Sequence, residues 1–81
     1  MIDIYPLVII KDRYMGTYSG GEYTAWNMYH EEIPEDIDED DVSCYAFWRS
    51  YSGVVGLGKT PDDAIKDLER KLAEVIREEY I

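Results

Sequence analysis

Cysteine and histidine are almost absent from this chain of 81 residues, which contains one of each, Cys44 and His30. A single cysteine excludes an intramolecular disulfide, and together the two residues are too few for a Cys/His zinc site. A Ser-His-Asp arrangement would need His30, and nothing in the sequence places His30 and Cys44 together as a dyad. We therefore expect no enzymatic activity, no cofactor and no metal. We expect Cys44 to be a small buried apolar residue in a reducing compartment.

Basic residues are also scarce: eight Lys and Arg stand against eighteen Asp and Glu, and the formal net charge is −10. A surface of this sign repels phosphate backbones and anionic membranes, which argues against nucleic acid and membranes as partners. Lys11 and Arg13 form the one basic cluster away from the C-terminal region. A protein with a basic surface is a more natural partner for this chain.

Long apolar runs are missing as well. No stretch approaches the roughly 20 apolar residues that span a bilayer. The N-terminal residues show no basic region followed by an apolar run and a cleavage site, so we expect no signal peptide. These features together predict a cytoplasmic protein.

Aromatic residues are abundant, with eight Tyr and two Trp, and 46% of all residues are hydrophobic. That composition is enough for a packed core and predicts one domain over residues 1–81. A chain of this size buries only about 60–65% of its unfolded surface, so its core is too small to hide every aromatic ring. We expect the surplus to line a groove, a pocket or a subunit interface, and we expect a homo-oligomer.

The first and last predicted strands are short. Residues 2–10 are almost wholly apolar and rich in β-branched side chains, which is typical of a buried strand. Pro6 lacks a backbone donor, so the strand is predicted over Leu7–Lys11. The last strand is predicted over Gly53–Lys59, with glycines where another backbone approaches closely.

The segment between residues 14 and 28 has two interpretations. Tyr14–Tyr18 and Glu22–Met28 both favour extended structure, and Ser19–Glu22 favours a turn because paired glycines adopt positive φ angles. The segment is therefore either one long bent strand with a glycine bulge or a true hairpin.

Acidic residues dominate the middle of the chain, where residues 31–41 hold eight of them in eleven positions. Ile33 and Ile37 predict a loop fixed to the body by two apolar contacts. A helix is predicted next, over Val42–Arg49, with Asp40 or Asp41 as its N-cap. A strand is the competing prediction, because Val, Tyr, Phe and Trp are good strand formers.

The clearest pattern lies at the C-terminal end. Thr60 is the predicted N-cap of a long helix, Pro61 suits its first position, and Asp62 and Asp63 suit its positive end. One apolar stripe follows at spacings of three and four residues, formed by Ala64, Ile65, Leu68, Leu72, Val75 and Ile76. We expect an α+β fold in which a small three-stranded, or four-stranded, antiparallel sheet is covered by this helix.

The run from Gly56 to Leu68 (Gly-Leu-Gly-Lys-Thr-Pro-Asp-Asp-Ala-Ile-Lys-Asp-Leu) resembles a junction in the HicB-like antitoxin domain. There a short strand ends in a Gly-acid-Thr-Pro-acid-acid-Ala type sequence that begins a long amphipathic helix. Ile4 to Ile9 is similar to the family's first strand with its Tyr-Pro pair, and Gly16 to Trp26 would be its second strand. The resemblance covers roughly two-thirds of the chain.

The resemblance implies a HicB-like body and a protein partner that the chain neutralises. Two departures limit it. Asn27–Ser52 is a long acidic and aromatic insert where the family has a short Pro-Asp-Leu-Pro-Gly-like link, and we expect no C-terminal DNA-binding module of the family's kind. Repressor activity is therefore not implied. The insert and the Ser-Gly-Gly-Glu-Tyr-Thr-Ala-Trp-Asn run before it also resemble short uncharacterised phage and prophage proteins, which implies a mobile-element setting.

The acidic segment is the first candidate site. We expect it to contact a basic protein partner and to inhibit it, through Glu31, Glu32, Glu35, Asp36, Asp38 and Glu39. Alternating acids at Asp36–Asp40 suggest a calcium loop, but the sixth position is Asp41 instead of glycine and the twelfth is Phe47 instead of glutamate.

The aromatic residues support an alternative function from another class. In it the chain is a phage-type anti-defence protein that sequesters a nucleotide-like small molecule between aromatic rings, with nearby polar groups fixing its orientation. The residues assigned to that pocket are Arg13, Tyr18, Tyr23, Trp26, Asn27, Trp48 and Arg49.

Overall fold

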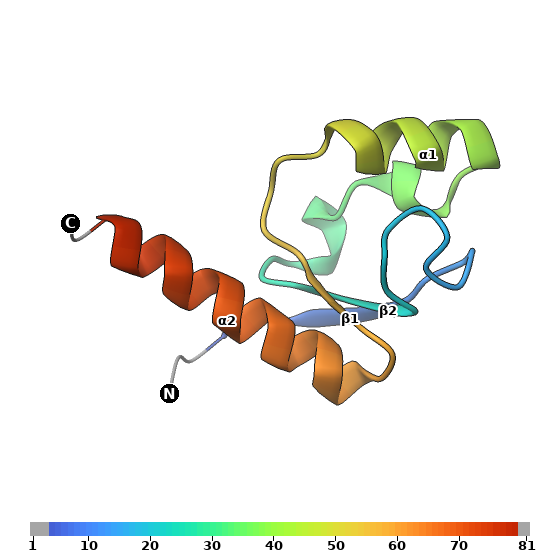
Figure 1. Cartoon of the computed structure of the whole chain (residues 1–81). Coiled ribbons are helices and arrows are strands. Elements are labelled where there is room, and N and C mark those ends of the chain that lie inside the picture. Colours follow the sequence, from blue (N-terminus) through green and yellow to red (C-terminus); the bar gives the residue numbers. More distant parts are fainter. Residues whose placement is uncertain (1–3, 80–81) are drawn as a thin grey trace.

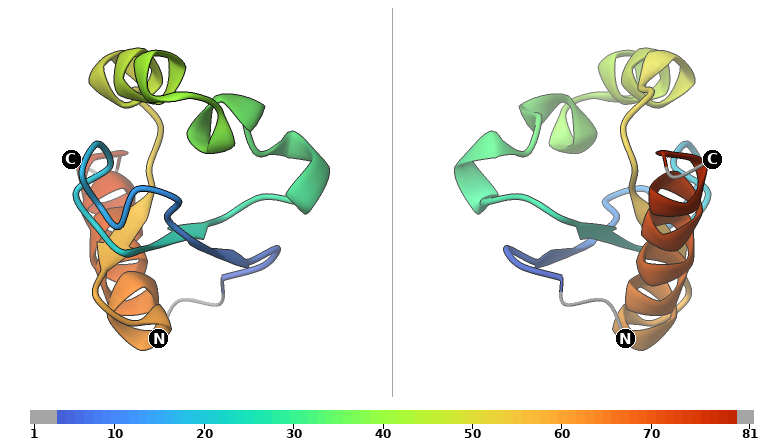
Figure 2. Two further views of the ribbon diagram at one scale, coloured as in Figure 1. Left: turned by 90° about the vertical axis from the view of Figure 1, so that its right-hand side faces the viewer. Right: turned by 90° about the vertical axis from the view of Figure 1, so that its left-hand side faces the viewer.

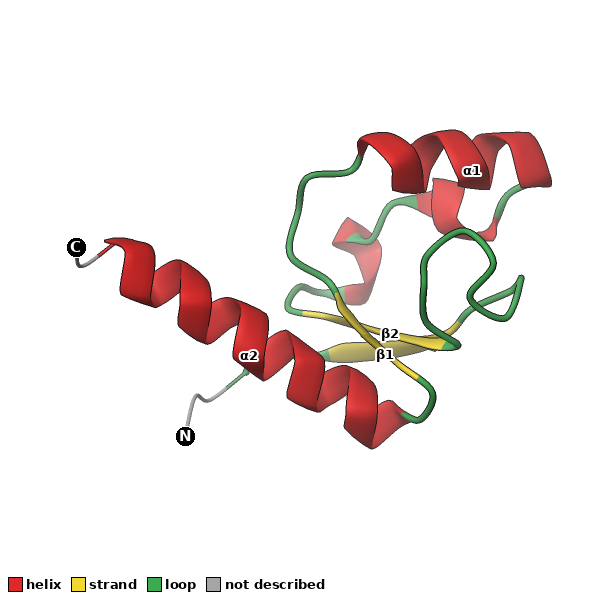
Figure 3. Cartoon of the chain, viewed as in Figure 1, coloured by secondary structure: helices red, strands yellow, loops and turns green. Residues whose placement is uncertain are grey.

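The structure, a computed structural model, describes residues 4–79, and the side chains of these residues except Asp38 and 76–79. It is an α+β fold in which a small sheet packs against a long C-terminal helix, with a short helix on the other side (Figures 1 and 3). The elements are β1 (Val8–Lys11), β2 (Tyr23–Trp26), the 3-10 helices η1 (His30–Glu32) and η2 (Glu35–Asp38), α1 (Asp41–Ser50), β3 (Gly56–Gly58) and α2 (Pro61–Glu79).

The sheet formed by the described residues has three antiparallel strands in the order β1-β2-β3. Val8 pairs with Trp26 in the first ladder, and Tyr23 pairs with Gly58 in the second. β1 begins one residue later than predicted, and β3 occupies the C-terminal half of the predicted Gly53–Lys59 strand. The predicted three-stranded sheet under a long helix is confirmed.

Alternation along the strands divides the interior into two apolar clusters, one on each face of the sheet. Ala25 of β2 faces α2, where it packs with Ala64 and Leu68, and all three are fully buried. Trp26, the next residue along β2, faces the other way and packs with Ile37 and Val55. Figure 2 shows the chain from residue 30 to residue 50 arching over this second face.

α2 approaches the sheet closely because Gly56 and Gly58 of β3 have no side chains to keep it away. A Cβ atom at Gly56 would collide with the carbonyl oxygen of Ala64 and would lie 2.6 Å from the Cβ of Leu68. The helix begins as predicted, since the hydroxyl of Thr60 accepts a hydrogen bond from the Asp63 amide at 3.1 Å. Capping and the glycine contacts fix where α2 begins and how it lies on β3.

Asp67 joins α2 to β3 through hydrogen bonds. Its Oδ2 accepts the Leu57 amide at 2.8 Å and the Lys71 ammonium at 2.8 Å, and its Oδ1 accepts from Arg70 at 2.7 Å. Partial burial raises the pKa of this carboxyl, but the three donors outweigh burial and lower the pKa from its usual 3.8 to about 2. The ionised carboxylate therefore stabilises the contact between helix and sheet.

Replacing Asp67 by asparagine should remove stability that depends on pH. The pKa of the folded state lies below that of the unfolded chain, so the contribution is complete above about pH 4 and is lost as pH falls through about 2. A shift of this size corresponds to about 2 kcal/mol near neutral pH. Urea unfolding of the native protein and of Asp67→Asn at a series of pH values measures this difference in stability. If the difference in free energy of unfolding between the native protein and Asp67→Asn stayed constant down to about pH 2, the charge of the Asp67 carboxylate would contribute nothing to stability.

The loop between β1 and β2 corrects the prediction for residues 14–28. Residues 13–19 form successive turns and are not extended, so neither a long bent strand nor a hairpin between 14–18 and 22–28 is present. The buried Asp12 causes this, because its Oδ2 accepts the amides of Tyr14 and Gly16 at 3.1 and 2.7 Å. Positive φ angles at Met15, Gly16 and Gly20 complete the path back to β2.

Candidate functional site

The acidic insert is folded rather than a simple loop. Its first part forms η1 and η2, and the predicted contacts are present, since Ile37 is buried and Ile33 packs against the same cluster. α1 follows and confirms the predicted helix over the competing strand. Asp40 is its N-cap, and its Oδ1 accepts the Ser43 amide at 3.0 Å. The insert is therefore a compact cover on the sheet face opposite α2.

Aromatic side chains hold the insert on the sheet. Trp26 is fully buried and its indole nitrogen donates to the Thr24 hydroxyl at 2.8 Å. The Trp48 and Tyr51 rings each lie with their centroids 5.8 Å from that of Trp26, and Phe47 stacks on Tyr51 at 4.7 Å. This cluster forms the core between β2 and α1, so the two tryptophans act here as packing residues.

Cys44 lies beside this core and is fully buried, as predicted. Its thiol donates to the Ile37 carbonyl with a distance of 3.6 Å between sulfur and oxygen. Burial, and after it the negative charge of Asp12, raise the pKa of the Cys44 thiol. A buried thiol with a raised pKa is a poor nucleophile, so its place in the fold is structural.

The acidic side chains of the insert lie at the surface. Five of the six predicted contact residues are exposed, namely Glu31, Glu32, Glu35, Asp36 and Glu39. The sixth, Asp38, lies in η2, and its side chain is outside the described part of the structure. Ion pairs within α2 join Arg70 to Asp67 and Glu74, and Lys71 to Asp67. The insert therefore presents an excess of exposed carboxylates, with the Arg13 guanidinium beside it donating to the Glu39 carbonyl at 3.3 Å.

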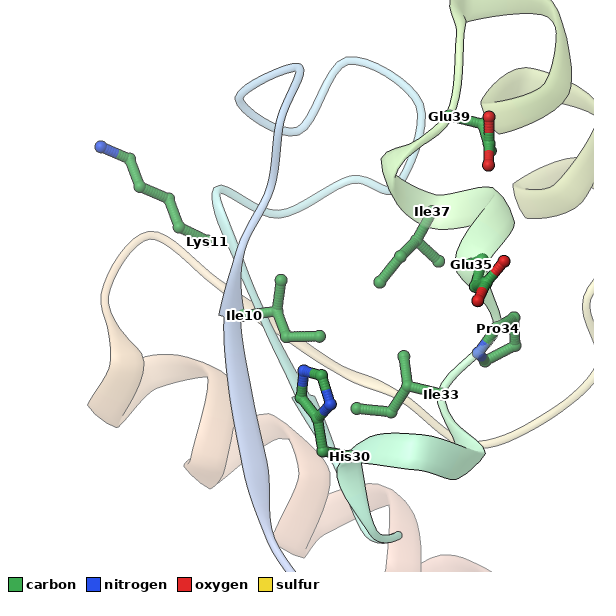
Figure 4. Close-up of a pocket in the computed structure, with 8 residues that line it drawn as sticks. All are labelled: Ile10, Lys11, His30, Ile33, Pro34, Glu35, Ile37 and Glu39. Carbon is green, nitrogen blue, oxygen red and sulfur yellow. The ribbon is translucent and has the colours of Figure 1, made fainter.

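A pocket of about 500 Å³ lies between β1 and the two 3-10 helices (Figure 4). Ile10 of β1, Ile33 directly after η1 and Ile37 of η2 point into it, while Lys11 points away from it. Its remaining lining comes from His30, Pro34, Glu35 and Glu39. The pocket thus combines an apolar interior with acidic side chains from the insert.

The sequence did not predict this pocket, because its walls come from residues more than twenty positions apart. The alternation along β1 was the available signal, since Ile10 must share a face with Val8 and, through the ladder, with Trp26. Which loop covers that face is not encoded locally.

A second surface combines tyrosine rings with two arginines. Tyr14 and Tyr18 have centroids 5.2 Å apart, and Tyr45 of α1 lies 6.0 Å from Tyr18. Arg13 lies over the ring of Tyr14 at 5.4 Å, and Arg49 lies over the ring of Tyr45 at 5.8 Å. Partial burial, and after it the nearby Asp41 carboxylate, raise the pKa values of Tyr14 and Tyr18, so both remain neutral phenols.

The seven residues predicted for a flat-ligand pocket do not meet in one place. Arg13, Tyr18 and Arg49 belong to the surface just described, whereas Trp26 and Trp48 belong to the core. Tyr23 packs on the opposite face of the sheet with α2. Asn27 is exposed, and its side-chain amide donates to the Pro6 carbonyl at 3.3 Å.

Comparison of the chain with protein-family models, with curated proteins and with solved structures gives no match. The HicB-like and phage-like resemblances therefore remain predictions. Among the described residues no helix is long and apolar enough to cross a membrane. The described side chains also contain no group of three or more His, Cys, Asp or Glu able to hold a metal ion.

Proposed function

We propose that this chain is a non-enzymatic binding module that contacts and neutralises a basic protein partner through its acidic, aromatic-rich insert. The observation that carries the proposal is the group of exposed carboxylates of the insert beside an apolar pocket. Like charges held close together repel one another, and a basic surface relieves that repulsion. An apolar cavity at the same place adds burial of partner side chains to charge attraction.

The folded state of the insert supports the same function. Trp26, Trp48 and Ile37 anchor it to the sheet, so the acidic residues are presented by an ordered scaffold. Binding then needs little ordering of the chain, and this lowers its entropic cost. Under this proposal the protein is a cytoplasmic, antitoxin-like inhibitor of phage or prophage setting, with a HicB-like body and further copies of itself as partners.

A second candidate function is the sequestration of a flat, anionic, nucleotide-like ligand. The observation that favours it is the surface of Tyr14, Tyr18 and Tyr45 flanked by Arg13 and Arg49. Aromatic faces stack on bases and guanidinium groups pair with phosphates, so this surface provides both elements of nucleotide recognition.

Native mass spectrometry of the protein isolated gently from its own host tests both candidates. We expect a protein partner of basic composition that dissociates as salt rises from about 0.1 M to about 1 M, because screening shortens the Debye length from about 10 Å to about 3 Å. An added mass of nucleotide size that persists in high salt would favour the second candidate. A partner of acidic composition would contradict the first.

A further inference from the structure

One edge of the sheet carries backbone groups for which the described residues provide no hydrogen-bond partner. β1 lies at the end of the strand order, with β2 as its one neighbour in the described sheet. The Asp12 amide donates to the Glu22 carbonyl at 2.7 Å, which marks this pair as a hydrogen-bonded pair of the antiparallel ladder. Alternate residues share that role, so Ile10 also points its backbone groups toward β2. The amide and carbonyl groups of Ile9 and Lys11 therefore point outward from the sheet.

The pocket adjoins this open edge. Ile10 contributes its backbone to β1 and its side chain to the pocket, so one residue belongs to both features. Figure 4 shows the cavity beside β1, with Glu35 and Glu39 on its far side. A strand added to β1 would place alternate side chains on the same face as Ile10, directed toward the cavity. Edge pairing and pocket filling are geometrically compatible for one extended segment.

We propose that β1 accepts an extended segment of the basic partner as a fourth strand, with an apolar side chain of that segment in the pocket. This inference rests on the proposed function and specifies its mode of binding. Backbone hydrogen bonds to Ile9 and Lys11 supply affinity, and the pocket selects the apolar residue. Lysine or arginine residues flanking that apolar residue pair with Glu35 and Glu39 at the pocket.

Charge selects a basic partner rather than a second copy of this chain for the edge. Pairing β1 with β1 of another copy would bring together two chains that each carry a net charge of −10. It would also bring the acidic inserts beside the two edges close to one another, with like charges facing. A segment rich in lysine and arginine is instead attracted by the acidic side chains beside this edge.

The test uses Lys11, which is exposed and whose amide points outward. Lys11→Pro removes that amide and places a ring in the path of an incoming strand, while Lys11→Ala removes the side chain and keeps the amide. The probes are peptides selected on the native chain from a random 12-residue library in about 0.15 M salt. Circular dichroism confirms that both variants keep the fold.

We expect the selected peptides to alternate apolar and basic residues. They should bind Lys11→Ala as tightly as the native chain or more tightly, and should bind Lys11→Pro about tenfold or more weakly. Methylation of every second peptide amide should weaken binding when the methylated amides are those that face β1, and should not weaken it when they are the amides that face away from β1. Equal binding to the two variants, or a selection that yields no peptide, overturns the inference.

Two further results separate the inference from the function on which it rests. If the native partner binds Lys11→Pro as tightly as it binds the native chain, yet loses affinity on charge reversal in the insert, strand addition is wrong and the proposed function stands. If Lys11→Pro converts a dimer into monomers without changing peptide binding, the edge belongs to a second copy of the chain, and this also overturns the inference.

Discussion

Trp26→Ala is expected to lower the free energy of unfolding by about 3–5 kcal/mol, the range found for removing a large buried aromatic side chain. Trp26 is fully buried in the cluster that joins β2 to the insert, and its indole nitrogen bonds to Thr24. Its removal leaves a cavity against Trp48 and Tyr51, and the buried Thr24 hydroxyl oxygen loses the donor that it accepts from. Small domains have total stabilities of about 5–15 kcal/mol, so much of the fold's stability is at stake.

Urea unfolding followed by circular dichroism measures this change. Tyr5→Ala is a suitable control because its side chain is 79% exposed, and a change within about 0.5 kcal/mol is expected there. A loss below about 1 kcal/mol in Trp26→Ala would contradict the role of this residue as the anchor of the insert. The large expected loss also means that weakened ligand binding in Trp26→Ala would report damage to the fold rather than a lost ligand contact.

Local signals were sufficient to predict α2. Thr60 and Pro61 mark the beginning of α2, because capping acts within a few residues. The apolar stripe marks the buried or partly buried face of the helix as far as Leu72, whereas Val75 is exposed and the side chain of Ile76 lies outside the described part of the structure. For α1 the sequence left two N-caps and a competing strand open, and the structure selects the helix with Asp40 as its N-cap. The burial of Cys44 follows from its place on the apolar side of that helix, opposite the exposed Val42.

Long-range packing decided the rest. The side chain of Asp12 folds the following residues into turns through hydrogen bonds to their backbone amides. The strand propensity of Tyr14–Tyr18 predicted extended structure there and gave no indication of these bonds. The exposure of the acidic residues was predictable from charge alone. Their position beside Ile10 was not, because it depends on how the insert folds over the sheet. Trp26 and Trp48 were predicted as ligand contacts, but they pack against each other in the core. Composition predicts that some aromatic rings are buried and does not say which ones.

Charge reversal within the insert is expected to abolish most of the affinity for the partner. Replacing Glu35, Asp36 and Glu39 by lysine turns attraction into repulsion at three exposed positions. Each exposed charge pair contributes about 0.2–1 kcal/mol, and reversal adds repulsion of similar size. We therefore expect an affinity loss of about 100-fold at low salt, equivalent to about 3 kcal/mol. The loss should shrink as salt rises, since these charges are accessible to counterions.

A matched control separates position from total charge. Replacing Glu22, Asp62 and Glu74 by lysine changes the net charge by the same amount at exposed positions outside the insert. Unfolding measurements on both variants confirm that each remains folded. The control should lose affinity only slightly, because its charges lie away from the proposed contact surface.

Isothermal titration calorimetry of the two variants against the partner identified from the host is the most direct test of the central claim. The account predicts that the insert variant binds about 100-fold more weakly than the native chain at low salt, while the control binds within a few fold of it. Equal affinities for the insert variant and the control would show that the acidic insert is not the contact surface.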